Sequence, residues 1–172
     1  MSPRFKARIA GFTYVFSVLT AVFGEFVLRG KVSYALGLFA VACYVVVTLL
    51  LYDLFSPVNG KIAVLALAFG IAGLALEAIR LQPWGMNLAM VFHGFYCLLF
   101  GYLFLRSTFL PRLLGALMAI AGLLWLTNFS TPLANFLFRY ITVIGLFGEG
   151  LPMLWLLIFG VNTSDWEAKA ST

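Results

Sequence analysis

Six long apolar runs constrain this chain more than any other feature, because each is bounded by charged residues, proline or glycine. A hydrocarbon core about 30 Å thick is crossed by roughly 20 helical residues, which is the length of most of these runs. The expected spans are residues 9–28, 32–52, 62–79, 86–105, 113–127 and 140–160. Residues 1–160 thus form a single transmembrane domain, followed by a polar C-terminal tail, residues 161–172. The sequence predicts an all-α integral membrane protein, a six-transmembrane-helix bundle with short loops.

Composition supports the same class. Hydrophobic residues make up 63% of the 172 residues and charged residues 10%, whereas a soluble domain has about 25% charged residues. A soluble fold and a disordered chain are therefore excluded. The connections are short, including a turn at Pro83–Trp84–Gly85 before the fourth run, so successive helices are expected to be antiparallel neighbours.

The basic residues predict an orientation. Eleven lysine and arginine residues and six acidic residues give a formal net charge of +5. The lysine and arginine residues stand at the ends of the apolar runs rather than in one patch. This distribution is typical of cations that lie at lipid headgroups, and it argues against nucleic acid as a partner. With the N-terminus inside, seven cations lie in inner segments (Arg4, Lys6, Arg8, Lys61, Arg106, Arg112 and Lys169) and four in outer segments (Arg29, Lys31, Arg80 and Arg139). Both termini are expected in the cytoplasm, and the first run is expected to be an uncleaved span rather than a signal peptide.

Small side chains within the runs are expected to serve packing. Those of the third and fifth runs recur on one helix face, which allows close approach of backbones: Ala66, Gly70 and Gly73, and Gly115, Ala119 and Gly122. The two cysteines, Cys43 and Cys97, lie deep in apolar runs. They are expected to be small apolar side chains rather than a disulfide or a metal pair.

Ionisable residues inside the spans are the best indication of a function. An ionisable group at the centre of a span costs about 2.5–3.5 kcal/mol to insert. Three of the six acidic residues, Glu25, Glu77 and Glu149, and the single histidine, His93, nevertheless lie within apolar runs. The alternation of spans places all four in the half of the bilayer that is expected to be the outer half. They are therefore candidates for one shared interior site, with Tyr96 one helical turn beyond His93.

Arginine offers an alternative explanation for two of these carboxylates. Glu25 and Arg29 are four residues apart, and Glu77 and Arg80 are three apart, so both pairs can close locally at a helix end. Glu149 has no such neighbour. It lies ten residues after Arg139, roughly 15 Å along a helix, in a stretch from Gly145 to Pro152 that is expected to weaken or break the helix.

Three functions remain, and the sequence leaves open whether the protein is an enzyme. The first is a protein that binds a small polar ligand or relays protons through Glu25, Arg29, Glu77, His93 and Glu149, with Arg80 and Tyr96 in secondary roles. It predicts a cavity open to the outer side. The second is an accessory subunit, whose polar groups serve only helix pairing with a membrane-protein partner or a second copy. It predicts the local pairs Glu25–Arg29 and Glu77–Arg80, no cavity, and an apolar face left for the partner. The third is a membrane metalloenzyme with His93, Glu149 and Glu25 as ligands. No nucleotide-binding or zinc-protease motif is present, and no metal or other cofactor is expected.

Four stretches resemble a known family. They are residues 7–11 with Tyr14, residues 24–31, residues 93–102 continuing into 106–115 and 121–122, and Gly148–Glu149 leading to residues 155–157 and 160–161. Together they are similar to the prokaryotic multi-pass membrane family known as domain of unknown function 4386. Its pattern matches this chain at Glu25, Arg29, His93, Arg106, Pro111 and Glu149. The region between the second and fourth spans is shorter here than is usual in that family, so no role is carried over from the resemblance to Glu77. The resemblance implies a multi-pass protein of the prokaryotic inner or plasma membrane and supports the site positions, but it implies no reaction.

Overall fold

Helices form nearly the whole chain in the computed structural model, which describes residues 1–83 and 86–171. The long helices are α1 (Pro3–Val27), α2 (Lys31–Phe55), α3 (Gly60–Ala78), α4 (Leu88–Arg106), α5 (Arg112–Leu126) and α6 (Thr131–Ile158). A short 3-10 helix, η2 (Thr127–Phe129), follows α5, and α7 (Thr163–Ala170) follows α6. Six candidate spans, α1 to α4, α5 with η2, and α6, are long and apolar enough to cross a membrane. The predicted all-helical fold with six candidate membrane spans is therefore confirmed.

Local sequence explains where the helices begin. Ser2 caps α1 by accepting a hydrogen bond from the Phe5 backbone N–H, and Pro3 occupies the first turn, where its missing N–H leaves no bond unmade. Asn59 and Asn87 cap α3 and α4 in the same way. Gly30 connects α1 to α2 with a φ of +69°, a left-handed conformation that glycine adopts without strain.

Helical structure extends beyond the expected spans at three places. Helix α1 begins at Pro3 rather than at residue 9, and α6 begins at Thr131 rather than at residue 140. The expected spans begin after Arg8 and Arg139, which are exposed. Each helix begins earlier, with a proline in its first turn, and continues through the arginine. Part of the expected polar tail forms α7. Trp84 and Gly85 of the expected turn, and Thr172 of the tail, lie outside the described residues.

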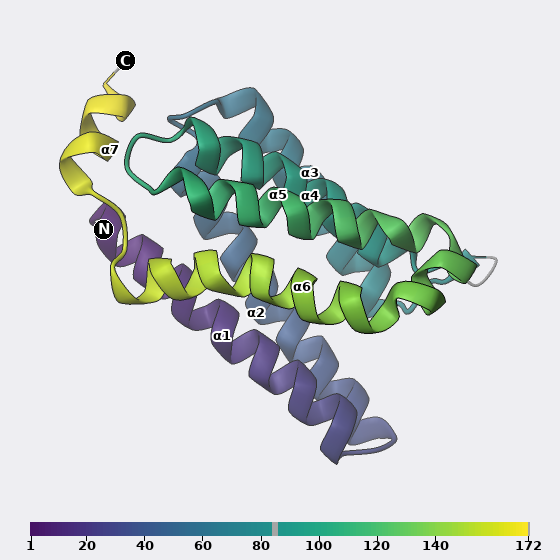
Figure 1. Ribbon diagram of the computed structural model, residues 1–172. Coiled ribbons are helices and arrows are strands. Elements are labelled where there is room, and N and C mark those ends of the chain that lie inside the picture. Colours follow the sequence, from purple (N-terminus) through teal and green to yellow (C-terminus); the bar gives the residue numbers. More distant parts are fainter. Residues whose placement is uncertain (84–85, 172) are drawn as a thin grey trace.

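The six long helices form a closed ring. Each packs on the next in the sequence, and α6 packs on α1. Figure 1 shows α6 lying between α1 and α5. The expected arrangement of sequential antiparallel neighbours is confirmed. One end of the ring, which we call the cavity end, holds the connections α1–α2, α3–α4 and α5–α6. The other, the terminal end, holds both termini and the remaining connections. Toward the cavity end, α1 and α2 splay away from α3–α6 (Figure 1).

Glycine lets α4, α5 and α6 approach closely. A Cβ on Gly101 of α4 would lie 2.8 Å from the Ala119 backbone nitrogen of α5, and a Cβ on Gly122 would lie 2.8 Å from the Gly94 carbonyl oxygen. On α6, a Cβ on Gly148 would lie 2.8 Å from the Leu117 carbonyl oxygen. Such distances are too short for any larger residue. The small-residue face expected on α5 is thus a packing face.

Pro152 does not break α6. The helix continues from Thr131 to Ile158, which corrects the expectation of a broken segment around Glu149. The neighbouring helices hold it on both sides: Gly148 contacts α5, and Gly11 of α1 would place a Cβ 2.5 Å from the Met153 carbonyl oxygen. Packing on α1 and α5 therefore compensates for the backbone hydrogen bond that Pro152 cannot donate.

Candidate functional site

Glu149 is the centre of a polar cluster inside the ring. Glu149 lies on α6 and is only 3% exposed. The hydroxyl of Tyr44 on α2 donates a hydrogen bond to Oε1, and Nε2 of His93 on α4 lies 3.0 Å from Oε2. Both carboxylate oxygens thus have partners from two other helices, as a buried carboxylate requires.

Aromatic rings hold the imidazole of His93 in place. Tyr96 stacks on it with ring centroids 5.4 Å apart. Tyr44 and Trp125 meet it edge-on at 5.6 Å and 5.9 Å. Such contacts fix the ring orientation, so Nε2 faces Glu149 in a defined geometry.

Cys97 joins this cluster, although the sequence indicated only a small apolar side chain there. Its Sγ lies 3.6 Å from Nε2 of His93. One ligand atom each from His93, Cys97 and Glu149 lies within 4.8 Å of the others, and this trio could hold a metal ion. The signal in the sequence was the spacing of four residues between His93 and Cys97, which places both on one face of α4.

A cavity of about 450 Å³ extends from this cluster toward the cavity end. All six long helices contribute to its lining. The charged or titratable residues among the lining are Tyr14, Glu25, Tyr34, Tyr44, Glu77, Arg80, His93 and Glu149. The structure therefore brings Glu25, Glu77, Arg80, His93 and Glu149 to one cavity. Tyr96 packs against His93 behind the lining, and Arg29 is exposed and outside it.

Neither local Glu–Arg pair forms. Among residues 1–83 and 86–171, no ion pair joins Glu25 to Arg29 or Glu77 to Arg80. The Arg80 guanidinium instead lies over the Tyr34 ring, 4.9 Å from its centroid. Arg80 also has a φ of +52°, an uncommon conformation for a residue with a side chain. The local pairing that the accessory-subunit hypothesis predicted is absent from the described part of the chain.

One buried donor near His93 has no partner. Within the described residues, the Trp125 indole N–H makes no hydrogen bond. Trp125 lines the cavity. An unsatisfied buried donor costs about 1–3 kcal/mol, so a donor beside a cavity favours a ligand or water that accepts from it.

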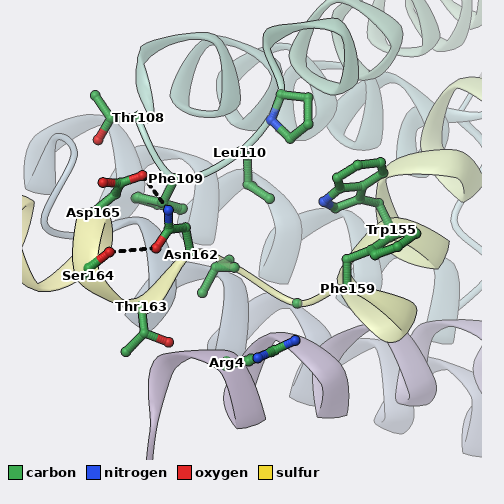
Figure 2. A pocket seen from close by; sticks show the side chains of 13 residues that line it. Arg4, Thr108, Phe109, Leu110, Trp155, Phe159, Asn162, Thr163, Ser164 and Asp165 are labelled. Atoms are coloured by element: carbon green, nitrogen blue, oxygen red, sulfur yellow. Dashed lines mark hydrogen bonds between the residues drawn. The ribbon is translucent and has the colours of Figure 1, made fainter.

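A second depression lies at the terminal end, between the start of α1, the α4–α5 connection and the start of α7 (Figure 2). Its polar groups are largely engaged with one another: Asn162 donates to Asp165, and the Ser164 hydroxyl donates to Asn162. Trp166 anchors α7 through a hydrogen bond of 2.7 Å to the Leu54 carbonyl oxygen. These bonds explain how α7 is held, and the depression contains none of the predicted site residues.

Comparison with known proteins gives a family but no activity. Residues 72–160 match the family described as "Domain of unknown function (DUF4386)". An "Uncharacterized protein" of Archaeoglobus fulgidus is 32% identical over 132 residues, which cover 70% of this chain and 79% of that protein. No solved structure matches. The matched region contains Glu77, His93, Cys97 and Glu149.

Proposed function

This chain belongs to the family of membrane proteins described as domain of unknown function 4386, and we propose that it binds a small polar ligand with a positive charge inside the membrane. The observation that carries the proposal is the convergence of three carboxylates from α1, α3 and α6 on one cavity. The positive-inside count predicts that this cavity opens to the outer side.

The charges of the lining favour a cation. Glu25, Glu77 and Glu149 face the cavity with one permanent cation, Arg80, and one histidine. Glu149 already has a partner on each oxygen, whereas neither Glu25 nor Glu77 forms an ion pair among the described residues. A positively charged ligand would supply a partner for these two carboxylates, whereas an anion would add to the repulsion.

The size and the aromatic lining favour an organic cation. A volume of about 450 Å³ is typical of sites for small molecules, which span about 300–1,000 Å³. Tyr34, Tyr44 and Trp125 line the cavity, and the faces of such rings attract ammonium groups. Carboxylates combined with aromatic faces are therefore suited to an amine or a quaternary ammonium group.

The positions of the carboxylates suggest an entry path. Glu25 and Glu77 lie in the last turns of α1 and α3, and both are exposed. Glu149 lies deep in α6 and is buried. A cation would meet Glu25 and Glu77 at the mouth before it reaches Glu149 and His93.

Thermal unfolding of the detergent-purified protein tests the proposal. The probes are choline and 3,3-dimethylbutan-1-ol, which have nearly the same shape but differ in charge. We expect choline to raise the melting temperature in a concentration-dependent way and the neutral alcohol to have a much smaller effect. Equal effects of the two, or stabilisation by small anions alone, would contradict the proposal. No effect of either probe would favour an accessory subunit.

A further inference from the structure

We propose that His93, Cys97 and Glu149 form a site for one divalent transition-metal ion of the zinc class, at the deep wall of the cavity. This site shares His93 and Glu149 with the proposed cation site, but it is tested separately through Cys97, which does not line the cavity, and Glu25, Glu77 and Arg80 take no part in it. It also differs from the ligand set expected from the sequence, since Cys97 takes the place of Glu25.

Two of the three separations between ligand atoms are already close to those of a metal site. Zinc binds sulfur at about 2.3 Å and histidine nitrogen at about 2.0–2.1 Å, so tetrahedral coordination places the two atoms roughly 3.5 Å apart. Sγ of Cys97 lies 3.6 Å from Nε2 of His93. Oε2 of Glu149 lies 3.0 Å from the same nitrogen, against roughly 3.3 Å in a tetrahedral site. The third separation, between Cys97 and Glu149, lies within the 4.8 Å that encloses all three ligand atoms. A side-chain rotation of Cys97 or Glu149 toward the other would complete the geometry.

Charge favours the metal over the empty site. A thiolate from Cys97 and a carboxylate from Glu149 carry two negative charges, which a divalent ion neutralises. The thiol proton, and any proton that His93 and Glu149 share, leave to water as the metal enters. The result is a neutral complex in an interior that disfavours isolated charge. A set of one sulfur, one nitrogen and one oxygen selects zinc or a similar ion over magnesium or calcium.

Neighbouring side chains hold His93 and Glu149 in orientations suited to binding a metal ion. Tyr44 donates to Oε1 of Glu149, which leaves Oε2 directed at His93. The stacked ring of Tyr96 holds the imidazole. Supporting contacts of this kind orient metal ligands. His93 and Glu149 also line the cavity, so the fourth coordination position faces a space that admits water or a polar ligand, as in open three-ligand sites.

Cobalt and zinc binding to the purified full-length protein tests the site. After treatment with a chelator, the protein is loaded with Co²⁺, whose bond to a thiolate gives a charge-transfer absorption in the near ultraviolet. Zn²⁺ is then measured by elemental analysis. We expect one metal ion per chain, a cobalt–thiolate absorption, and displacement of Co²⁺ by Zn²⁺.

Matched cysteine variants identify the ligand. Cys97→Ser should remove the cobalt–thiolate absorption and weaken metal binding at least tenfold, whereas Cys43→Ser on α2 should change neither. The metal site would be overturned if Cys97→Ser kept the cobalt–thiolate absorption. It would also be overturned if the wild type bound less than one metal ion per chain and showed no cobalt–thiolate absorption. Should Cys97→Ser fail to fold, the presence or absence of the absorption in Cys43→Ser decides, because Cys97 is then the single thiol.

The same variants separate this inference from the proposed function. Choline binding that persists in Cys97→Ser, together with loss of the cobalt–thiolate absorption, supports both. Stoichiometric thiolate-bound metal in a protein that does not bind choline supports the metal site alone.

Discussion

Glu149 on α6 and His93 on α4 lie 3.0 Å apart, Oε2 to Nε2, although 56 residues separate them and their helices are not neighbours in the ring. Both helices pack on α5, and the contact spans the interior. Close packing makes this possible, because glycines at Gly94, Gly122 and Gly148 bring α4 and α6 to within reach of one another across α5. The pair is therefore a property of the whole ring rather than of one helix.

Glu149→Gln should leave folding largely intact, because a glutamine can accept from Tyr44 and donate to His93 in the same geometry. Choline stabilisation should be lost. Glu25→Gln, at the exposed mouth, should weaken the choline effect to a smaller degree. Membrane expression and melting temperature of both variants check this. Equal and complete loss of expression in both would instead indicate a structural role for these carboxylates.

Tyr44→Phe should lower stability by about 1–3 kcal/mol, because it removes the donor to Oε1 of a buried carboxylate. Metal affinity should fall by about 10–100-fold, the usual cost of removing a supporting contact. Unfolding in detergent and Zn²⁺ titration measure the two effects. Tyr140→Phe is the control, since Tyr140 is exposed on α6 and should tolerate the change; a similar loss in both variants would argue against a specific role for Tyr44.

Gly122→Ala should destabilise the protein by about 1–3 kcal/mol, because the new Cβ would lie 2.8 Å from the Gly94 carbonyl oxygen. Gly150→Ala is the matched control, with no atom within 4 Å of its Cβ position, and should be neutral or stabilise α6 by about 0.5–1 kcal/mol. Thermal unfolding of the two variants provides the comparison. Equal stability of both would show that the α4–α5 contact is looser than the structure indicates.

Trp125 should report on occupation of the cavity, because its indole lies in the lining and meets His93 edge-on. Choline should change the intrinsic fluorescence of the wild type, and Trp125→Phe should lose most of that change. Trp166→Phe, at the terminal end, should keep it. A response that survives in Trp125→Phe would place the ligand elsewhere.

The sequence predicted the helices better than it predicted the site. The length of the apolar runs was enough to predict six long helices. The alternation of the spans was enough to predict that Glu25, Glu77, His93 and Glu149 lie toward the same end of the bundle, where they line one cavity. The starts of α1 and α6 lie before Arg8 and Arg139, because an arginine at the end of an apolar run marks a membrane boundary but does not end a helix. Pro152 was overestimated as a breaker because the packing of α1 and α5 on α6 cannot be read from α6 alone.

The contacts of Tyr44, Arg80 and Cys97 could not be predicted from the sequence with the same certainty as the helices. Tyr44 occupies an apolar span in which a tyrosine is unremarkable, and only the tertiary fold brings its hydroxyl to Glu149. Arg80 was expected to pair with Glu77, but the positive φ at the end of α3 turns it over Tyr34. Cys97 was within reach of sequence reasoning, since it stands four residues from the single histidine, but a cysteine in an apolar helix is more often simply packed.

Equilibrium binding of radiolabelled choline to purified wild type, Glu149→Gln and Glu167→Gln tests the central claim most directly. Glu167 lies on α7, outside the cavity, and serves as the matched control. We expect saturable binding to the wild type and to Glu167→Gln, and a loss of about 2 kcal/mol or more in binding free energy for Glu149→Gln, the usual cost of removing one partner of a buried charge pair. Equal affinity in all three proteins would contradict a cation site at Glu149.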